Sequence, residues 1–205
     1  MQNPKLILGT HNPKKRLELT DLLKDLPLQI LDLCSYSEVK EIEETETTFA
    51  ANADLKASAY AKATKEWTLA EDSGLVVPAL KGAPGIYSAR YSGVHGDHAA
   101  NNRKIVEEIK LLGLTDCPAY YVCAASLADP EGSIRARSEG RCHGRIILTP
   151  RGNEGFGYDP LFLIPEYHRT FAELSLSVKQ ALSHRGKAIH GLRSALWQIA
   201  RHSEK

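Results

Sequence analysis

Two neighbouring acidic residues, Glu71 and Asp72, stand between a short apolar run at residues 67–70 and the turn-forming pair Ser73-Gly74. The apolar run predicts a strand, so both acids are expected where a strand leaves the core. Strand ends in α/β proteins face the crevice where ligands bind, and adjacent carboxylates repel each other unless a cation or a proton intervenes. The pair therefore indicates either a cation site or a solvated turn that ends a strand.

A second polar group could bind an anion. It follows a predicted buried strand at residues 6–9 and consists of Thr10, His11, Asn12, Pro13, Lys14 and Lys15. Leucines at positions 19, 22, 23 and 26 have helical spacing, so a helix that Pro27 ends should follow, with Glu18 pointing away from its core. Positive charge opposes the dipole at a helix N-terminus, so the two lysines favour a phosphate there, although surface lysines are also common at such positions. The Walker pattern is absent.

The acidic run at residues 38–46 leads into a predicted helix that begins at Thr47 or Thr48 and continues to about Lys65. The helix is predicted from its alanine content and from a hydroxyl available for its N-cap. Lys56 lies on this helix. A charge run is usually a solvated loop, but carboxylates at a helix N-terminus could also hold a cation.

Strands dominate the prediction for the second half of the chain. Residues 98–112 predict a helix, whereas residues 119–128 and 134–148 flank a strong turn signal at 129–132 and indicate an antiparallel hairpin. A last strand is expected at 161–164. In the preceding glycine-rich loop, Phe156 could stack on a planar ring or be a buried turn residue. Basic side chains at Lys179, His184, Arg185 and Lys187 crowd just before a final amphipathic helix.

Composition limits the classes of function. The 205 residues include 26 Lys and Arg against 25 Asp and Glu, so no whole-molecule field draws the chain to nucleic acid or to a membrane. Four cysteines without a CxxC pair indicate neither a disulfide scaffold nor structural zinc. Without a signal-peptide core or an apolar run of about 18 residues, we expect a single globular domain in the cytoplasm.

Together, the polar clusters supply what a polyphosphate with a hard divalent cation requires. Carboxylates suit Mg²⁺, lysines suit the remaining phosphate charge, and an aromatic side chain suits a base. A covalent mechanism has no support, because Ser73 lacks a GxSxG elbow and Cys142-His143 falls within a predicted strand.

The chain resembles the dITP/XTP pyrophosphatases, also called inosine triphosphate pyrophosphatases, over nearly its whole length. Six motifs in the right order carry the resemblance, and they lie at residues 10–15, 43–53, 72–75, 82–91, 156–160 and 183–186. The resemblance implies an α/β fold with a long mixed β-sheet flanked by helices, and two lobes with an active-site cleft between them, as one domain over residues 1–205. It also implies a homodimer that hydrolyses deaminated purine nucleoside triphosphates (ITP, dITP and XTP) to the monophosphate and pyrophosphate.

Particular residue roles are implied by the same resemblance. Residues 10–15 would hold the phosphates, Glu44 and Asp72 would bind Mg²⁺, and Asp72 would also be the base for the attacking water. The remaining substrate contacts would come from Lys56, Ser73, Phe156, Gly157, Tyr158, Asp159, Lys179, His184 and Arg185. Arginine offers only donors and histidine can offer another, so His184 and Arg185 could read the 6-keto oxygen of hypoxanthine or xanthine.

Three positions depart from the family pattern: Glu71 replaces a more usual Asp, Glu46 a Gly, and Ala51 a frequent acid. A lost glycine at Glu46 could reshape the turn that aims Glu44, and metal affinity could change. Two alternatives remain, namely a Maf-type pyrophosphatase of other base preference and a non-catalytic nucleotide or RNA binder.

Overall fold

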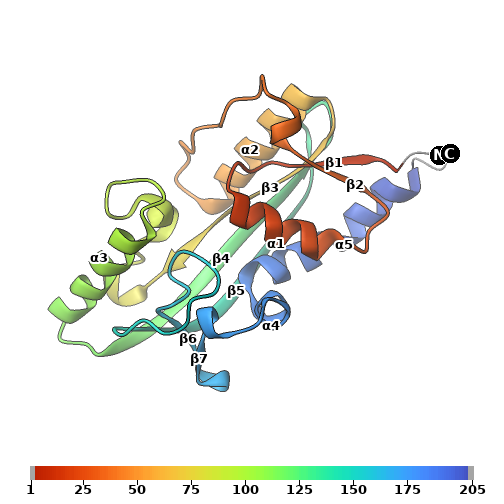
Figure 1. The fold of residues 1–205 in the computed structure, drawn as a ribbon. Coiled ribbons are helices and arrows are strands. Elements are labelled where there is room, and N and C mark those ends of the chain that lie inside the picture. Colours follow the sequence, from red (N-terminus) through yellow and green to blue (C-terminus); the bar gives the residue numbers. More distant parts are fainter. Residues whose placement is uncertain (1–2, 203–205) are drawn as a thin grey trace. The chain divides into compact units, whose positions relative to one another are not determined.

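The computed structural model describes residues 3–202, in which seven strands form one mixed sheet (Figure 1). β1 pairs in parallel with β2 and β3, whereas β6 pairs antiparallel with β5 and β7. The strand order is β2-β1-β3-β4-β5-β6-β7, with bounds β1 Lys5–Leu8, β2 Gln29–Asp32, β3 Trp67–Val76, β4 Asp116–Ala128, β5 Ile134–Ile147, β6 Phe162–Ile164 and β7 Arg169–Thr170. The predicted α/β class with a mixed sheet is confirmed.

In the described part of the chain, five α-helices lie between or after the strands in the sequence. They are α1 Pro13–Leu23, α2 Phe49–Thr64, α3 His98–Leu111, α4 Leu176–Leu182 and α5 His184–His202. Within residues 3–202, none of these helices has the length and apolar character that crossing a membrane requires.

The chain forms two compact units, each assembled from separate segments. Unit 1 comprises Met1–Asp72, Cys123–Gly140 and Arg185–Lys205, and unit 2 comprises Ser73–Val122 and Arg141–His184. The single domain predicted over residues 1–205 stays a prediction, and its residues 1–2 and 203–205 lie outside the described part.

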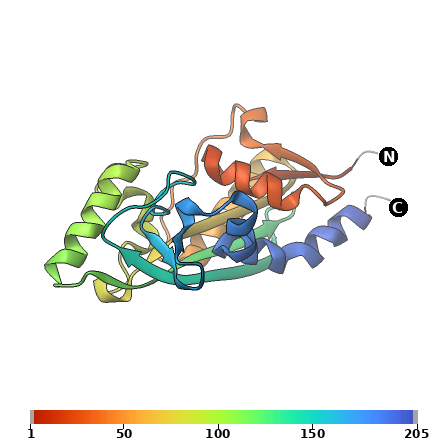
Figure 2. The same ribbon diagram turned by 60° about the horizontal axis from the view of Figure 1, so that its bottom comes forward.

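The core of unit 1 divides between the two faces of its strands. Leu6, Leu8 and Leu69 pack with apolar side chains of α1 and α5, which lie side by side (Figures 1 and 2). Ile7 and Ala70, the alternate residues, pack with side chains of α2 instead. Since successive side chains of a strand point to opposite faces, the position of a residue along β1 or β3 determines which helices it meets.

Helix α2 begins where its sequence predicts. The Thr48 hydroxyl accepts a hydrogen bond from the Ala51 backbone N–H at 3.1 Å, as an N-cap does. One stripe of the helix is buried, and it carries polar side chains among its alanines: Asn52, Ala53, Lys56, Ala57, Tyr60, Ala61 and Thr64. The helix therefore directs an amide and an ammonium group inward.

Unit 2 has its own aromatic core. Leu75 in β3 and Val77 just after it pack with Ile105 and Ile109 of α3, and the helix predicted at residues 98–112 is confirmed. A tight turn joins β4 to its neighbour β5, and the Asp129 N–H donates to the Ser133 carbonyl at 3.0 Å. The predicted hairpin position is correct.

Three local expectations are wrong. No turn interrupts β3 at Ser73-Gly74, because pairing within the sheet and burial override the turn preference of these two residues. Helix α1 ends at Leu23, before Pro27, and Glu18 on it is buried. The residues from His184 to Lys187 form the first turn of α5 and do not precede it.

Candidate active site

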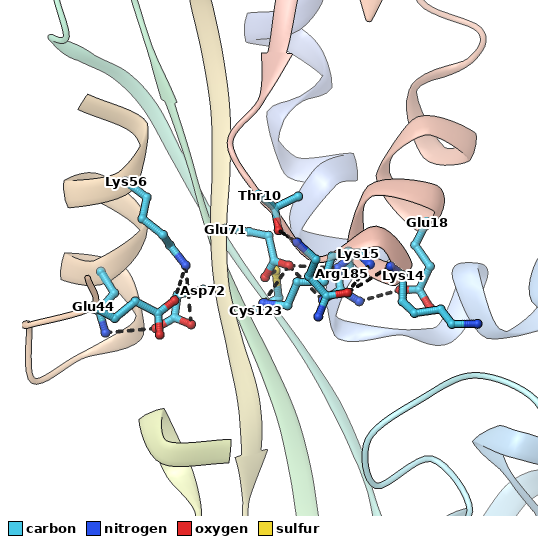
Figure 3. A network of polar contacts seen from close by, with 12 residues as sticks. Thr10, Lys14, Lys15, Glu18, Glu44, Lys56, Glu71, Asp72, Cys123 and Arg185 are labelled. Atoms are coloured by element: carbon cyan, nitrogen blue, oxygen red, sulfur yellow. Dashed lines mark hydrogen bonds and ion pairs between the residues drawn. The ribbon is translucent and has the colours of Figure 1, made fainter. Parts of the chain in front are cut away.

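The two neighbouring acids lie on opposite faces of the same strand. Glu71 and Asp72 occupy the middle of β3 and are 1% and 3% exposed. Figure 3 shows Asp72 beside Glu44 and Lys56, whereas Glu71 points to Lys15 and Arg185 across the strand. The sequence therefore encodes two separate charged groups within unit 1.

The group on the α2 side joins two carboxylates through one ammonium. Lys56 Nζ lies 2.5 Å from Glu44 Oε1 and 3.9 Å from Asp72 Oδ1 (Figure 3). The side chains of Lys56 and Asp72 are almost completely buried, while that of Glu44 is 23% exposed. Glu44 thus supplies the solvent-facing side of this group.

The protonation of this group reflects both burial and charge. Burial is the largest influence on the pKa of Asp72 and raises it above the usual carboxyl value, despite the opposing charges of Lys56 and Lys15. Burial also acts most strongly on Lys56 and lowers the pKa of its ammonium, but Asp72 and Glu44 outweigh burial and the net pKa is raised. Lys56 therefore stays protonated at neutral pH, and the Asp72 carboxylate accepts a proton more readily than usual.

Asn52 completes the surroundings of Asp72. Its side-chain Nδ2 donates to Asp72 Oδ2 at 3.1 Å, and its Oδ1 accepts from the Glu46 N–H at 3.0 Å. Asn52 lies in the motif at residues 43–53, and no role was predicted for it. A polar residue on the alanine-rich face of a predicted helix was the signal that could have identified it.

The group on the opposite face is a buried network of four charges. The Arg185 guanidinium donates to Glu71 Oε1 from Nη2 at 2.9 Å and to Glu18 Oε2 from Nη1 at 2.5 Å. Lys15 Nζ lies 3.2 Å from the same Glu71 oxygen. Two cations and two anions thus balance one another, and Arg185 is only 2% exposed.

A buried thiol closes this network. Cys123 Sγ lies 3.4 Å from Glu71 Oε2. Complete burial, followed by the charge of Glu71, raises the pKa of Cys123 well above its usual value. The thiol therefore stays protonated at neutral pH.

The start of α1 offers side chains to an anion. Asn12 caps the helix, and its Oδ1 accepts from the Lys14 and Lys15 backbone N–H groups at 2.9 and 3.2 Å. Thr10 Oγ1 in turn accepts from the Asn12 N–H at 3.1 Å. These amides are thus already engaged, so an anion would meet the Thr10 hydroxyl and the lysine ammonium groups. His11, Pro13 and Lys14 are exposed.

Glu44 and Asp72 are the pair that could hold a divalent cation. Mg²⁺ commonly takes one or two protein carboxylates and completes its shell with water and phosphate oxygens. Both carboxylates face the Lys56 ammonium, so the site already accommodates positive charge. Residues 3–202 contain no cluster of three or more His, Cys, Asp or Glu side chains that could hold a metal alone. The pair fits a cation shared with substrate.

Glutamate at position 46, where the family usually has glycine, causes no backbone strain. Glu46 does not adopt a positive φ, so the glycine that is usual there is not required for conformation. Its N–H and carbonyl both contact the Asn52 side chain. The loop that carries Glu44 is therefore anchored at Glu46.

In unit 2, the loop at residues 155–159 surrounds a buried ion pair. Lys179 Nζ and the Phe156 N–H both donate to Asp159 Oδ2 at 2.8 Å. The ammonium lies 5.1 Å from the centre of the Phe156 ring. A Cβ at Gly155, whose φ is +77°, would lie 2.1 Å from the same carboxylate oxygen. Gly155 is thus required for this pair, and Lys179 is not part of an exposed basic cluster.

The other predicted substrate residues of unit 2 pack around the same loop. The His184 ring stacks on Tyr121, with centroids 4.7 Å apart and an angle of 8°. Asn102 Nδ2 donates to the Gly157 carbonyl at 3.1 Å, and the Tyr158 hydroxyl donates to the Ser88 carbonyl at 2.9 Å. Ser73 follows on β3 and is partly exposed. Asn102 and Tyr121 are contacts of this loop that sequence reasoning missed.

These features define the class of protein as an α/β protein with a mixed sheet, in which lysines lie beside carboxylates on both faces of one strand. The chain belongs to the Ham1 family, whose model matches residues 6–195.

Similar proteins agree in sequence and fold. A dITP/XTP pyrophosphatase of Rhodopirellula baltica is 49% identical over 90% of this chain and 88% of its own length. A dITP/XTP pyrophosphatase of Desulforamulus reducens is 44% identical over 98% and 99%, respectively. The solved structure of a HAM1 protein from Coxiella burnetii has a TM-score of 0.86 and 38% identity, covering 95% of this chain and 99% of that chain.

Replacing Arg185 by leucine is expected to lower the free energy of unfolding by about 3–5 kcal/mol, because it leaves Glu18 and Glu71 buried without their shared cation. Urea denaturation at pH 7 measures this change. Arg193→Leu is the matched control on the same helix, since Arg193 pairs with exposed Asp25 and such pairs contribute about 0–1 kcal/mol. Equal losses in the two variants would contradict the assigned importance of the network.

Asp72→Asn is expected to stabilise the fold at neutral pH. The folded-state pKa of Asp72 lies above its unfolded value, so ionisation weakens the folded state at pH 7, and this penalty disappears below the unfolded pKa. The variant should melt above the wild type at pH 7, by about 2–4 °C for each kcal/mol of penalty removed. The difference should shrink as the pH falls towards the usual carboxyl value of 3.8.

Calorimetry between neutral and acidic pH measures this difference. Asp25→Asn is a control of opposite sign, because the bond with Arg193 lowers the pKa of Asp25 and its charge favours the folded state. A lower melting temperature for Asp72→Asn than for the wild type at pH 7 would refute the expectation.

Proposed function

We propose that this protein hydrolyses the deaminated purine nucleoside triphosphates ITP, dITP and XTP to the monophosphate and pyrophosphate, and so cleanses the nucleotide pool. The observation that carries the proposal is the buried group of Asp72, Lys56 and Glu44 in a chain that belongs to the Ham1 family. Relatives with close to half of their residues identical are dITP/XTP pyrophosphatases, which supports the same reaction and substrate class here.

The triphosphate is assigned to the start of α1. Because the Asn12 side chain occupies two backbone N–H groups, phosphate binding falls to the Thr10 hydroxyl, His11 and the ammonium groups of Lys14 and Lys15. Pro13 fixes the first turn of the helix and offers no N–H. Lys15 already faces Glu71, so its ammonium is held close to where phosphate would bind.

The metal and the base are assigned to the α2 side of β3, which is near enough to the start of α1 for the charge of Lys15 to act on Asp72 (Figure 3). Glu44 and Asp72 would hold Mg²⁺, which would neutralise phosphate charge and favour pyrophosphate as the leaving group. Asp72 would accept the proton of the attacking water, a role that its raised pKa suits. Lys56 keeps both carboxylates from repelling each other and would meet a phosphate oxygen on substrate binding.

Recognition of the base is assigned to unit 2. Phe156 supplies an aromatic face, and the loop of Gly157, Tyr158 and Asp159 is held by Lys179 and Asn102. His184 lies at the first position of α5, where an imidazole N–H could donate to the 6-keto oxygen. Ser73 completes the polar contacts.

In our proposal Arg185 does not contact the base itself. Its guanidinium donates to Glu71 and Glu18, so reading the base with that group would break buried ion pairs. We assign Arg185 to holding the first turn of α5, which carries His184. We also propose a cytoplasmic homodimer, as the family resemblance suggests.

A pyrophosphate-release assay over ITP, dITP, XTP, ATP, GTP, dTTP and UTP tests the proposed function. We expect release from the first three with Mg²⁺ and its loss on chelation. We also expect kcat/KM for ITP to exceed that for ATP by about 10⁴-fold, since buried donors left unpaired discriminate strongly. Preference for dTTP or UTP would indicate a Maf-type enzyme, and RNA binding without release would indicate a non-catalytic binder.

Asp72→Asn is expected to lower kcat by about 10²- to 10⁴-fold, the usual contribution of a general base, while the protein stays folded. The matched control is Asp54→Asn on the same side of the fold, because Asp54 pairs with Arg137 at the surface and should not affect turnover. Steady-state kinetics and circular dichroism measure both effects. If Asp72→Asn retains more than about a tenth of wild-type kcat, Asp72 is not the base.

A further inference from the structure

We propose that Asn52 is a positioning residue for the reaction: its side-chain amide holds the Asp72 carboxylate and the loop that carries Glu44 in one arrangement. The proposal rests on the proposed roles of Asp72 and Glu44. Asn52 lies one turn before Lys56 on α2 and is 1% exposed. Its side chain forms hydrogen bonds to Asp72 and to the backbone of Glu46 in that loop.

Three hydrogen bonds orient the amide. Oδ1 accepts from the Glu46 N–H at 3.0 Å, whereas Nδ2 donates to the Glu46 carbonyl at 3.4 Å and to Asp72 Oδ2 at 3.1 Å. The Glu46 N–H can only donate, so the amide oxygen must face the loop. The amide nitrogen must then face Asp72. The orientation follows from chemistry and not from a choice between two equivalent positions.

This orientation specifies the direction of both carboxyl oxygens of Asp72. Oδ2 is held by an N–H donor, and Oδ1 lies towards the Lys56 ammonium at 3.9 Å. The same amide anchors Glu46, two residues after Glu44. One side chain therefore links the proposed base to the loop that carries the second proposed metal ligand, and separating Asp72 from that loop would break a hydrogen bond to Asn52.

Helix stability alone does not require an amide at this position. The Asn52 backbone N–H already donates to the Thr48 carbonyl at 3.1 Å, and alanine occupies three of the six other buried positions of α2. Asparagine forms helices less readily than alanine and its amide must be desolvated. A residue with these costs, placed between two charged groups, fits the role of outer contacts that orient metal ligands.

Asn52→Asp separates the two functions of the amide. The aspartate can still accept from the Glu46 N–H, but it presents an oxygen to Asp72 Oδ2 where a donor stood. We expect kcat to fall about 10- to 100-fold, as for other orienting contacts, while KM changes less because the phosphate-binding residues lie on α1. Asn52→Ala removes both contacts and should lower kcat at least as much.

Asn101→Asp is the matched control. Asn101 is also buried, and its amide likewise accepts one backbone N–H, from Ser92, and donates to two acceptors, the carbonyls of Ser88 and Ala89. It contacts no carboxylate through these bonds. The substitution imposes the same chemical change, so it should lower the melting temperature comparably but leave kcat within about threefold.

Hydrogen exchange in the substrate-free protein gives a readout independent of activity. The Glu46 amide should remain protected in Asn52→Asp, which keeps its acceptor, and should exchange faster in Asn52→Ala. A double variant that combines Asn52→Asp with Asp72→Asn swaps the amide and the carboxylate. It again places an amide N–H donor opposite a carboxylate acceptor. It should recover melting temperature relative to Asn52→Asp without recovering kcat.

The outcomes separate this inference from the proposed function. Absence of pyrophosphate release from the wild type would remove the function, whereas the exchange rates of Glu46 would still test the anchor. Equal kcat values for Asn52→Asp and Asn101→Asp would overturn the positioning role. An unchanged exchange rate of the Glu46 amide in Asn52→Ala would overturn the anchoring of the loop. If Asn52→Asp does not fold, the Glu46 exchange rate in Asn52→Ala alone tests the proposal.

Discussion

Side-chain alternation along β3 is the constraint on which the rest of unit 1 depends. Leu69 and Glu71 face α1 and α5, and Ala70 and Asp72 face α2, because the apolar residues of each pair are buried against those helices. A shift of one residue in the strand would exchange the acids between the two faces and bury a charge without its partner. Packing of two apolar side chains thus determines where two carboxylates lie.

Each acid is tolerated in the interior because its own face supplies compensation. Glu71 meets Arg185 and Lys15, which leaves a balanced set with Glu18. Asp72 meets Lys56 and the Asn52 amide, but it shares Lys56 with Glu44. On the Asp72 face one ammonium thus lies beside two carboxylates, whereas on the Glu71 face two cations lie beside two carboxylates.

Much of this architecture could be predicted from local sequence, and the exceptions have physical reasons. Alanine content and the cap hydroxyl located α2 because these signals act within a few residues. The turn predicted at Ser73-Gly74 was wrong because strand pairing from distant segments overrode a local preference. Glu18 was expected to point away from the core because its partner Arg185 is 167 residues away, and no local pattern indicates such a pair. The basic residues Lys179 and Arg185 looked like one cluster in sequence, yet each is neutralised by a different distant acid.

The distance in sequence between Arg185 and its partners has a consequence for synthesis of the chain. Glu18 and Glu71 precede Arg185 by 167 and 114 residues. During translation, α5 is therefore synthesised long after both carboxylates. The apolar side chains of α1 and β1 that pack on α5 are also made before it. Until then, Glu18 and Glu71 lack the guanidinium that they share, and α1 alone covers this face of the strands. We expect the protein to depend on rapid completion, and codon or temperature changes that slow elongation after α4 would expose this unfinished face to chaperones or to other chains.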